Sequence, residues 1–301
     1  MEVAERQRIL FGTRGWSYAD WKGVFYPEER PRGFSELSFA AEYFDALEVN
    51  STFYRPASPA MAASWAKRVE GKKGFEFTAK LYQRFTHNRE EQWTAAEADE
   101  VKRGMAPLAE AGKLGGILVQ FPWSFKNEAV ERKWLERLVA EFAEYPLYLE
   151  VRHDSWREED FFKYLDEAGV GFVDIDQPVI GKSIPPMEKV TGGKGYVRFH
   201  GRNAKAWFAK DAGRDARYDY LYDENELSAW VERIRKMTGS AEKVFVFNNN
   251  HYRGQAAVNS LELKSLLTGE RVEAPAELVA AYPRLGLIVK KSGGEKQGRL
   301  M

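Results

Sequence analysis

The segment Pro146-Leu147-Tyr148-Leu149-Glu150-Val151-Arg152-His153-Asp154-Ser155-Trp156 joins an apolar run to a cluster of ionisable and aromatic side chains. Side chains alternate between the two faces of a strand, so Glu150 and Arg152 point the same way, opposite Leu149 and Val151. Burying an unpaired charge is costly. We therefore expect a buried strand whose final polar side chains pair with each other, contact a ligand or lie at a solvated strand end.

The same arrangement of an apolar run and a polar end recurs along the chain. Eight segments have this strand character, and they span residues 8–13, 46–54, 75–81, 115–122, 146–156, 170–176, 195–202 and 243–250. Segments with helical spacing separate most of them, at residues 34–44, 60–69, 94–111, 128–142, 158–168, 225–237 and 255–267. Ser35 is the expected cap of the first of these helices. Residues 177–194 are rich in proline and glycine, so we expect a loop there in place of the sixth helix.

Eight strands that alternate with helices predict an α/β fold, a closed eight-stranded parallel (β/α)8 barrel of the TIM type. The whole chain, 1–301, is expected to form one domain with a core of about 8–267 and a C-terminal strap and frayed tail over 268–301. The alternative is a doubly wound sheet. A nucleotide-binding sheet of that kind would place a Gly-x-Gly-x-x-Gly turn after the first strand, and Gly12 and Gly15 alone do not make one.

Composition narrows the classes of protein and of site. Lys plus Arg and Asp plus Glu are 45 each, so the net charge does not indicate a nucleic-acid or membrane-surface protein. The chain has no cysteine, which excludes disulfides, thiolate catalysis and cysteine-based metal sites. No apolar run reaches the roughly 18–20 residues of a membrane helix, and residues 1–7 do not resemble a signal peptide. We expect a cytoplasmic protein without a membrane partner.

Polar side chains gather where the predicted strands end. In a parallel barrel these carboxyl ends meet at one end of the molecule, where barrel enzymes place their active groups. The candidates that bind a ligand there are Asn50, Lys80, Gln120, Arg152, Arg198, Asn248 and Asn249, and those with chemistry to offer are Glu150, His153 and His200. Arg14, Trp16, Tyr18 and Tyr54 lie on loops that follow strands and are further ligand-binding candidates. Residues 203–223 form an insertion of the kind that acts as a lid or rim.

Three chemical interpretations fit these residues. Glu150 and His200 could perform acid–base work while Lys80, Arg152 and Arg198 bind an anion. Glu150 and His200 could instead bind a divalent metal with Asp174 or Asp176, although the neighbouring arginines would repel a cation. In the third interpretation, Trp16, Tyr18, Trp21 and Tyr54 stack on a ligand or on single-stranded nucleic acid without chemistry. A further, non-chemical interpretation is that these charges only form a structural ion-pair network, among Glu48, Lys80, Glu150, Arg152 and Arg198.

Several ordered motifs resemble one known family. They are Gly12-Thr13-Arg14-Gly15-Trp16-Ser17-Tyr18, Glu48-Val49-Asn50-Ser51-Thr52-Phe53-Tyr54, Gln120-Phe121-Pro122, Glu150-Val151-Arg152-His153, Arg198-Phe199-His200-Gly201-Arg202 and Phe247-Asn248-Asn249. Together they resemble the YecE-like family, domain of unknown function 72, over Gly12 to about Leu267. The resemblance implies a TIM-type barrel and names no reaction.

We predict from these observations a hydrolase or lyase that acts on a small anionic or sugar-phosphate-like ligand. Glu150 and His200 are the expected acid–base pair, and His153 is a further catalytic candidate. The expected partner is the small anion alone, with no cofactor. A divalent metal and a nucleic acid are the less favoured alternatives. The sequence does not indicate an oligomeric state.

Overall fold

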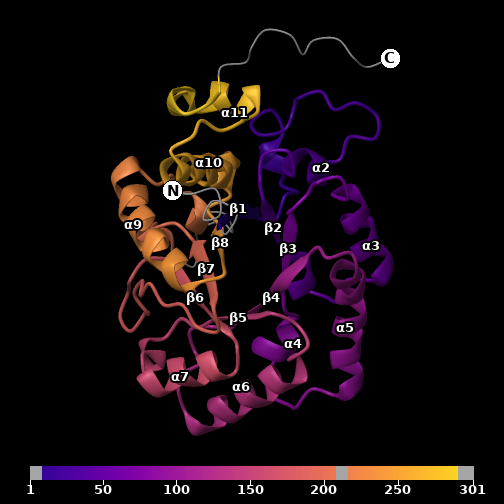
Figure 1. The fold of residues 1–301 in the computed structure, drawn as a ribbon, viewed down its shortest axis with the longest axis vertical. Helices are drawn as coiled ribbons and strands as arrows, with labels where there is room; N and C mark the ends of the chain where they lie inside the picture. Colours follow the sequence, from indigo (N-terminus) through magenta and orange to yellow (C-terminus); the bar gives the residue numbers. More distant parts are fainter. Residues whose placement is uncertain (1–8, 208–215, 291–301) are drawn as a thin grey trace.

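The computed structural model describes residues 9–207 and 216–290. At the centre lies a closed barrel of eight parallel strands in sequence order, with β1 paired to both β2 and β8 (Figure 1). The strands are β1 (Ile9–Arg14), β2 (Ala46–Val49), β3 (Glu76–Lys80), β4 (Leu114–Gln120), β5 (Leu147–Glu150), β6 (Gly171–Asp176), β7 (Lys194–Phe199) and β8 (Lys243–Asn248). Each overlaps a predicted segment, so the TIM-type barrel is confirmed and the doubly wound sheet is excluded.

Helices surround this ring of strands (Figure 1). They are α2 (Glu36–Ala40), α3 (Pro59–Arg68), α4 (Gln83–Thr86), α5 (Ala95–Glu110), α6 (Ala129–Glu141), α7 (Glu159–Glu167), α8 (Ala204–Trp207), α9 (Glu224–Ser240), α10 (Gln255–Thr268) and α11 (Ala276–Ala281). Short 3-10 turns are η1 (Ala19–Trp21), η2 (Ser51–Phe53), η3 (Asp154–Trp156), η4 (Ala216–Tyr218), η5 (Tyr252–Gly254) and η6 (Pro283–Leu287). None of the helices that the structure describes is long and apolar enough to cross a membrane.

Capping residues in the sequence set where several helices begin. Ser35, the predicted cap, accepts a hydrogen bond from the first turn of α2 at 3.1 Å. Helices α5 and α9 begin with reciprocal capping boxes, formed by Thr94 with Glu97 and by Asp223 with Glu226. A cap of this kind contributes about 1 kcal/mol by satisfying backbone N–H groups that have no partner inside the helix. The caps thereby fix the point at which each chain segment turns back along the barrel.

The crossover between β6 and β7 is a loop without a helix, as predicted. The carboxylate of Asp174 holds it by accepting hydrogen bonds from the backbone N–H groups of Met187 at 2.8 Å, Glu188 at 3.0 Å and Lys189 at 2.8 Å. Asp174 therefore points out of the barrel toward the loop. Its structural partners explain why a carboxylate can be buried at this place.

Aromatic rings fill the interior of the barrel below its carboxyl end. The ring of Tyr148 lies 4.9 Å from that of Tyr196 and 5.7 Å from that of Phe245, and all three side chains are buried. Fully burying such a side chain stabilises the fold by roughly 1.5–3 kcal/mol. The next inward residues on the same strands are Glu150 and Arg198. This alternation places charged groups directly above an apolar layer.

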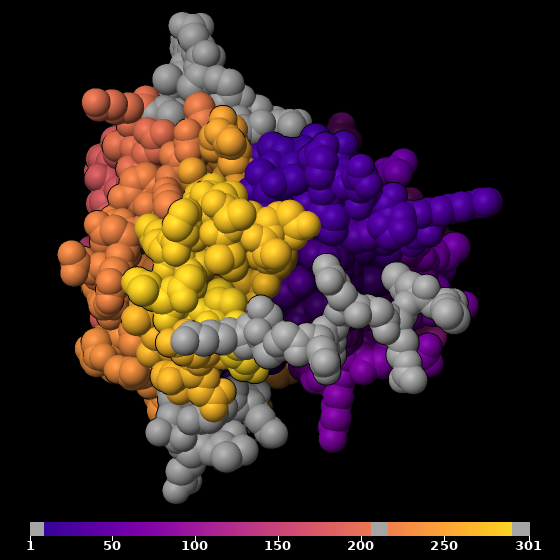
Figure 2. Space-filling view, turned by 90° about the horizontal axis from the view of Figure 1, so that it is seen from above, coloured from indigo at the N-terminus to yellow at the C-terminus, as the bar shows by residue number. Residues whose placement is uncertain are grey.

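The last described residues cover the outside of the barrel. Leu278 of α11 and Leu285 of η6 are fully buried, and Val272 pairs with Val289. Figure 2 shows this yellow segment between the indigo N-terminal and orange C-terminal parts of the surface. This segment, in which a strap was predicted, contains the short helix α11, which was not predicted. The predicted frayed tail lies mainly at 291–301, outside the described residues.

The close approach of β1 to β2 gives a test of the barrel. A Cβ added at Gly12 would lie 1.8 Å from the carbonyl oxygen of Ala46. Because Gly12→Ala would force the strands apart, we expect the free energy of unfolding to fall by about 3 kcal/mol, measured by equilibrium urea denaturation. The control is Gly239→Ala in α9, where an added Cβ meets no atom within 4 Å. It should leave stability equal or raise it by about 0.5–1 kcal/mol. A Gly12→Ala protein as stable as wild type would contradict this strand packing.

Candidate functional site

Arg198, on the inward face of β7, is the central side chain at the carboxyl end of the barrel. It is 2% exposed. Its guanidinium donates one hydrogen bond to Glu48 of β2 at 2.7 Å and another to Glu150 of β5. Both carboxylates are fully buried. One cation therefore links three strands that are far apart in the sequence.

The second oxygen of Glu48 is held from below. It accepts a hydrogen bond from the hydroxyl of Tyr196 at 2.7 Å, and that hydroxyl lies 2.9 Å from Thr78 Oγ1. Tyr196 thus connects the aromatic layer of the barrel to the charged layer above it. With Arg198 on the other oxygen, both oxygens of this buried carboxylate are satisfied.

Arg152 continues the network from β5 toward the loop. Its Nε and Nη2 donate to Glu150 Oε1 at 2.9 and 2.7 Å, and its Nη1 donates to Gln177 at 3.2 Å. Burial alone would raise the pKa of Glu150, but Arg198 and Arg152 outweigh it and hold the pKa well below the ordinary value. Glu150 is therefore an ionised anchor whose two oxygens are both engaged. This differs from its predicted part in an acid–base pair.

His200 lies between Arg152 and Asn249. Its Nε2 is 3.2 Å from Arg152 Nη2, and its Nδ1 is 2.7 Å from Asn249 Nδ2. Arg14 donates to the amide oxygen of Asn249 at 2.8 Å, which turns the amide N–H toward His200. Burial and the neighbouring Arg152 lower the pKa of His200 to about 3. The imidazole is thus neutral near pH 7 and accepts a hydrogen bond at Nδ1.

We call these connected residues the central network. Its members are Arg14, Glu48, Glu150, Arg152, Arg198, His200 and Asn249. It contains three guanidinium groups (14, 152 and 198) and two carboxylates (48 and 150), a surplus of one positive charge with His200 neutral. Among the described residues, Arg14 forms no ion pair with a carboxylate, and its Nε is buried without a hydrogen-bond partner. The surplus charge therefore lies at Arg14.

Tyr218 of η4 borders the network at Arg14. The Arg14 guanidinium lies 5.7 Å from the centre of its ring, which also packs against His251 at 4.8 Å. Burial would raise the pKa of the Tyr218 phenol, but Arg14 and Arg152 outweigh burial and lower it. Tyr218 was not predicted as a site residue, because it lies in the irregular stretch 203–223, where no strand alternation assigns a direction to a side chain.

Lys80 of β3 lies beside the network without joining its hydrogen bonds. It is 7% exposed, and its Nζ is 3.7 Å from the centre of the Phe53 ring. The His87 ring packs on the same Phe53 at 4.8 Å. Burial and the nearby Lys80 lower the pKa of His87 to about 4. Lys80 thus lies against an aromatic ring near a neutral imidazole.

Four other predicted residues lie around the carboxyl end. Gln120 is in register with Glu150, and its amide donates to the Phe121 carbonyl at 2.6 Å. Asn50 precedes η2 and has a buried Oδ1 without a partner among the described residues. Tyr54 is 61% exposed. Asn248 is fully buried but has the strand parity of the outward-facing Val246, so it points to the helical layer.

Three predicted residues have mainly structural contacts. Trp16 packs against Trp65 and Phe77 at 5.9 and 6.0 Å. The hydroxyl of Tyr18 donates to the backbone of Arg14, and its ring stacks on His251. His153 caps η3 by accepting from the Ser155 N–H at 3.1 Å, and it is not a member of the central network.

The two aspartates considered as metal ligands point away from His200. Asp174 holds the loop described above, and Asp176 accepts hydrogen bonds from Arg202 and from the Tyr222 hydroxyl. On β6 the inward residues are instead Val173 and Ile175, which follow the parity of Tyr196 and Arg198. In the described part of the chain, no group of three or more His, Asp or Glu side chains is placed to bind a metal.

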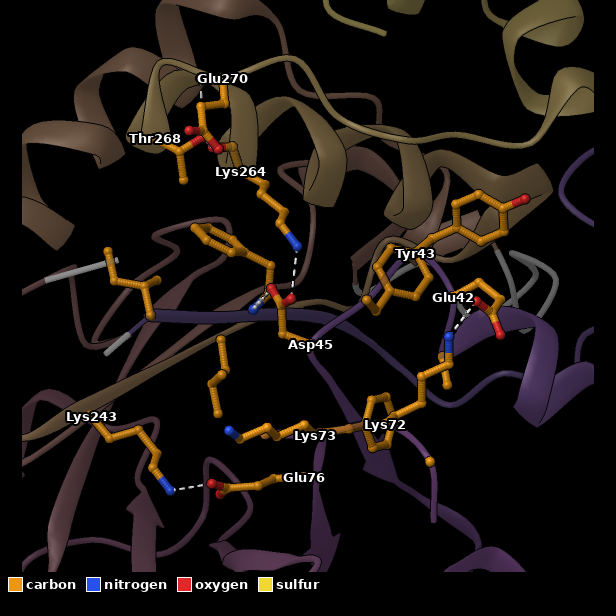
Figure 3. Close-up of a pocket in the computed structure, with 18 residues that line it drawn as sticks. Glu42, Tyr43, Asp45, Lys72, Lys73, Glu76, Lys243, Lys264, Thr268 and Glu270 are labelled. Carbon is orange, nitrogen blue, oxygen red and sulfur yellow. Dashed lines mark hydrogen bonds and ion pairs between the residues drawn. The ribbon is translucent and has the colours of Figure 1, made fainter. Parts of the chain in front are cut away.

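A cavity of about 770 Å³ lies at the opposite, amino-terminal end of the strands (Figure 3). Several of its charged side chains form ion pairs, including Lys264 with Asp45 at 2.7 Å and Lys243 with Glu76. Barrel enzymes place their chemistry at the other end. The cavity shares no residue with the central network, and we do not assign the function to it.

The central network yields a stability prediction. Arg198→Met leaves Glu48 and Glu150 buried without their shared cation, so we expect the free energy of unfolding to fall by about 3–5 kcal/mol at neutral pH. The deficit should shrink toward about pH 4. The lowered pKa of Glu150 gives wild type a stability that is complete above the ordinary pKa of 4.5 and is lost as the pH falls from there toward the lowered value. In the variant, protonation of the carboxylates removes the uncompensated charge. Urea denaturation at both pH values measures this.

The matched control is Arg235→Met on the exposed surface of α9, where the arginine pairs with Glu232 at 2.7 Å. It should change stability by less than about 1 kcal/mol. An Arg198→Met protein that behaves like this control would show that the buried ion pairs do not stabilise the barrel.

This chain is similar to known proteins of one family. A family model described as protein of unknown function DUF72 matches residues 10–281. The UPF0759 protein YunF of Bacillus subtilis (strain 168) is 29% identical over 272 residues, 86% of this chain and 94% of YunF. The UPF0759 protein YecE of Escherichia coli (strain K12) is 24% identical over 189 residues, 60% of this chain and 64% of YecE.

Solved structures agree with this assignment. The crystal structure of a DUF72 family protein from Thermotoga maritima MSB8 is 33% identical to this chain and superposes with a TM-score of 0.76. The match covers 87% of this chain and 99% of that one. The chain therefore belongs to the DUF72 family, the YecE-like family that its motifs resemble.

Proposed function

We propose that the carboxyl end of the barrel binds a small anionic ligand, of the sugar-phosphate kind, and that the protein acts on it as a hydrolase or lyase. The observation that carries the proposal is Arg14. It is held by Asn249 and borders Tyr218, with no carboxylate partner among the described residues. A guanidinium left uncompensated in a largely buried setting favours an anion, which would form charge-assisted hydrogen bonds with it.

The remaining arginines are better suited to positioning than to binding. Both Arg152 and Arg198 already pair with carboxylates. They hold the charged layer rigid, so that an arriving anion meets groups that need no rearrangement. Arg152 is the more exposed of the two, and its Nη2 reaches His200 as well as Glu150. It can therefore transmit the charge of a bound anion to the imidazole.

His200 is the acid–base group in this proposal. In the free protein Arg152 helps to keep the pKa of His200 low, at about 3. A bound anion opposes that effect and favours the imidazolium, so the pKa of His200 rises when the ligand binds. A group that gains basicity only beside its ligand is poised to take a proton there. Glu150 supports it as a fixed negative charge 3.7 Å from Nε2.

The alternatives have less support. A metal site built from Glu150, His200 and an aspartate would need Asp174 or Asp176 at the carboxyl end, and both point outward. Nucleic-acid stacking would need free aromatic faces, and the rings of Trp16 and Tyr18 already contact other aromatic rings. Tyr54 alone of the predicted stacking residues is strongly exposed.

Anion binding can be tested with sulfate as the probe. We expect isothermal titration calorimetry at neutral pH to detect one site. Arg14→Met should weaken sulfate binding at least about ten-fold, a loss of about 1.4 kcal/mol, because the variant lacks the uncompensated cation.

The control is Lys73→Met, which removes a lysine that lines the cavity at the opposite end of the barrel. It should bind sulfate as wild type does. Wild-type affinity in Arg14→Met, or an equal loss in Lys73→Met, would contradict the proposed anion site.

A further inference from the structure

Lys80 differs from Arg152 and Arg198 in having no acidic partner, and from Arg14 in having no hydrogen bond among the described residues. Arg198 contacts two carboxylates and Arg152 contacts one. Within the described residues, the Lys80 ammonium forms no ion pair and no hydrogen bond, and it faces the Phe53 ring at 3.7 Å. A buried ammonium without acceptors is unfavourable, because nothing replaces its lost hydration.

The surrounding charges act in the same direction. Burial lowers the pKa of Lys80 well below the ordinary value, and Arg14 and Arg198 lower it further, against weaker opposition from Glu150 and Glu48. A lysine that is desolvated and lies next to other cations is the recognised form of a nucleophilic amine. Glu48 and Glu150 direct oxygens to Arg198, and neither forms an ion pair with Lys80.

We propose that Lys80 is a nucleophile that forms a Schiff base with a carbonyl group of the anionic ligand. The inference rests on the proposed function, because Arg14 would hold the anionic end of the ligand. It narrows the substrate class to anions that carry an aldehyde or ketone. It also changes the predicted role of Lys80 from an anion-binding cation to a reacting group.

The chemistry balances without a further reagent. The Nζ lone pair attacks the carbonyl carbon, a C–N bond forms, and the carbonyl oxygen takes a proton to give a carbinolamine. The C–O bond then breaks, and oxygen leaves as water with both protons that the amine has lost. The product is an imine between Nζ and the former carbonyl carbon. A neutral imidazole such as His87, on the same side of the barrel as Lys80, suits the proton transfers.

The test is reductive trapping on the full-length protein. Pyruvate, a small carbonyl-bearing anion, is added at neutral pH with sodium borohydride, and the modified lysines are located by peptide mass spectrometry. We expect the adduct at Lys80 to exceed that at any exposed lysine at least ten-fold. Lys80→Arg should lose this adduct, and Lys73→Arg should keep it. Circular dichroism and thermal unfolding establish that both variants are folded.

A second measurement separates an unreactive amine from a poor probe. The rate of Lys80 modification by acetic anhydride should change little between neutral and alkaline pH, whereas exposed lysines react much faster as the pH rises. Labelling of Lys80 to the same extent as surface lysines would overturn the proposal. So would a rate of Lys80 modification that rises with pH as the rates of exposed lysines do. If the protein binds sulfate but forms no Lys80 adduct, the Schiff-base proposal is wrong and the proposed anion site stands. If the protein neither binds sulfate nor forms a Lys80 adduct, both proposals are wrong.

Discussion

The contact on which the rest of the carboxyl end depends is that of Arg198 with Glu48 and Glu150. Removing one cation and two carboxylates from water costs free energy, which direct hydrogen bonds among these groups must offset. The network does so by engaging both oxygens of each carboxylate. The same bonds hold β2, β5 and β7 in a fixed relation above the aromatic layer. Charge pairing here therefore shapes the barrel as well as its chemistry.

The consequence for function is an imbalance of charge. Once Glu48 and Glu150 are engaged by Arg198 and Arg152, no described carboxylate remains for Arg14. Burial, reinforced by the positive field of the arginines, lowers the pKa of His200 and of Lys80. In the proposed function, a structural network and a reactive site are therefore not alternatives. Together with burial, the buried ion pairs disfavour a positive charge on the neighbouring imidazole and amine.

The alternation of side chains along the strands predicted part of this arrangement. It failed where nothing in the sequence showed which face of a strand points into the barrel. It placed Glu150 and Arg152 together on the inward face near Arg198, because charges on a buried strand must pair, contact a ligand or lie at a solvated end, and in the structure they pair. It also grouped Asp174 with Asp176, but parity shows that two residues share a face without showing which face it is. In a parallel barrel the helix-covered face is as buried as the interior, so Val173 and Ile175 could occupy either one. The position of Tyr218 beside Arg14 and the lack of an acidic partner for Lys80 result from tertiary contacts. The periodicity of the sequence does not predict such contacts.

The central claim is that the central network, at the carboxyl end of the barrel, carries one uncompensated positive charge at Arg14. Its most direct test is a structure from crystals of the protein grown with sodium sulfate. The account predicts a sulfate within hydrogen-bond distance of the Arg14 guanidinium, with Arg198 still bonded to Glu48 and Glu150. A sulfate absent from this end, or an Arg14 side chain paired with a carboxylate of its own chain, would contradict it.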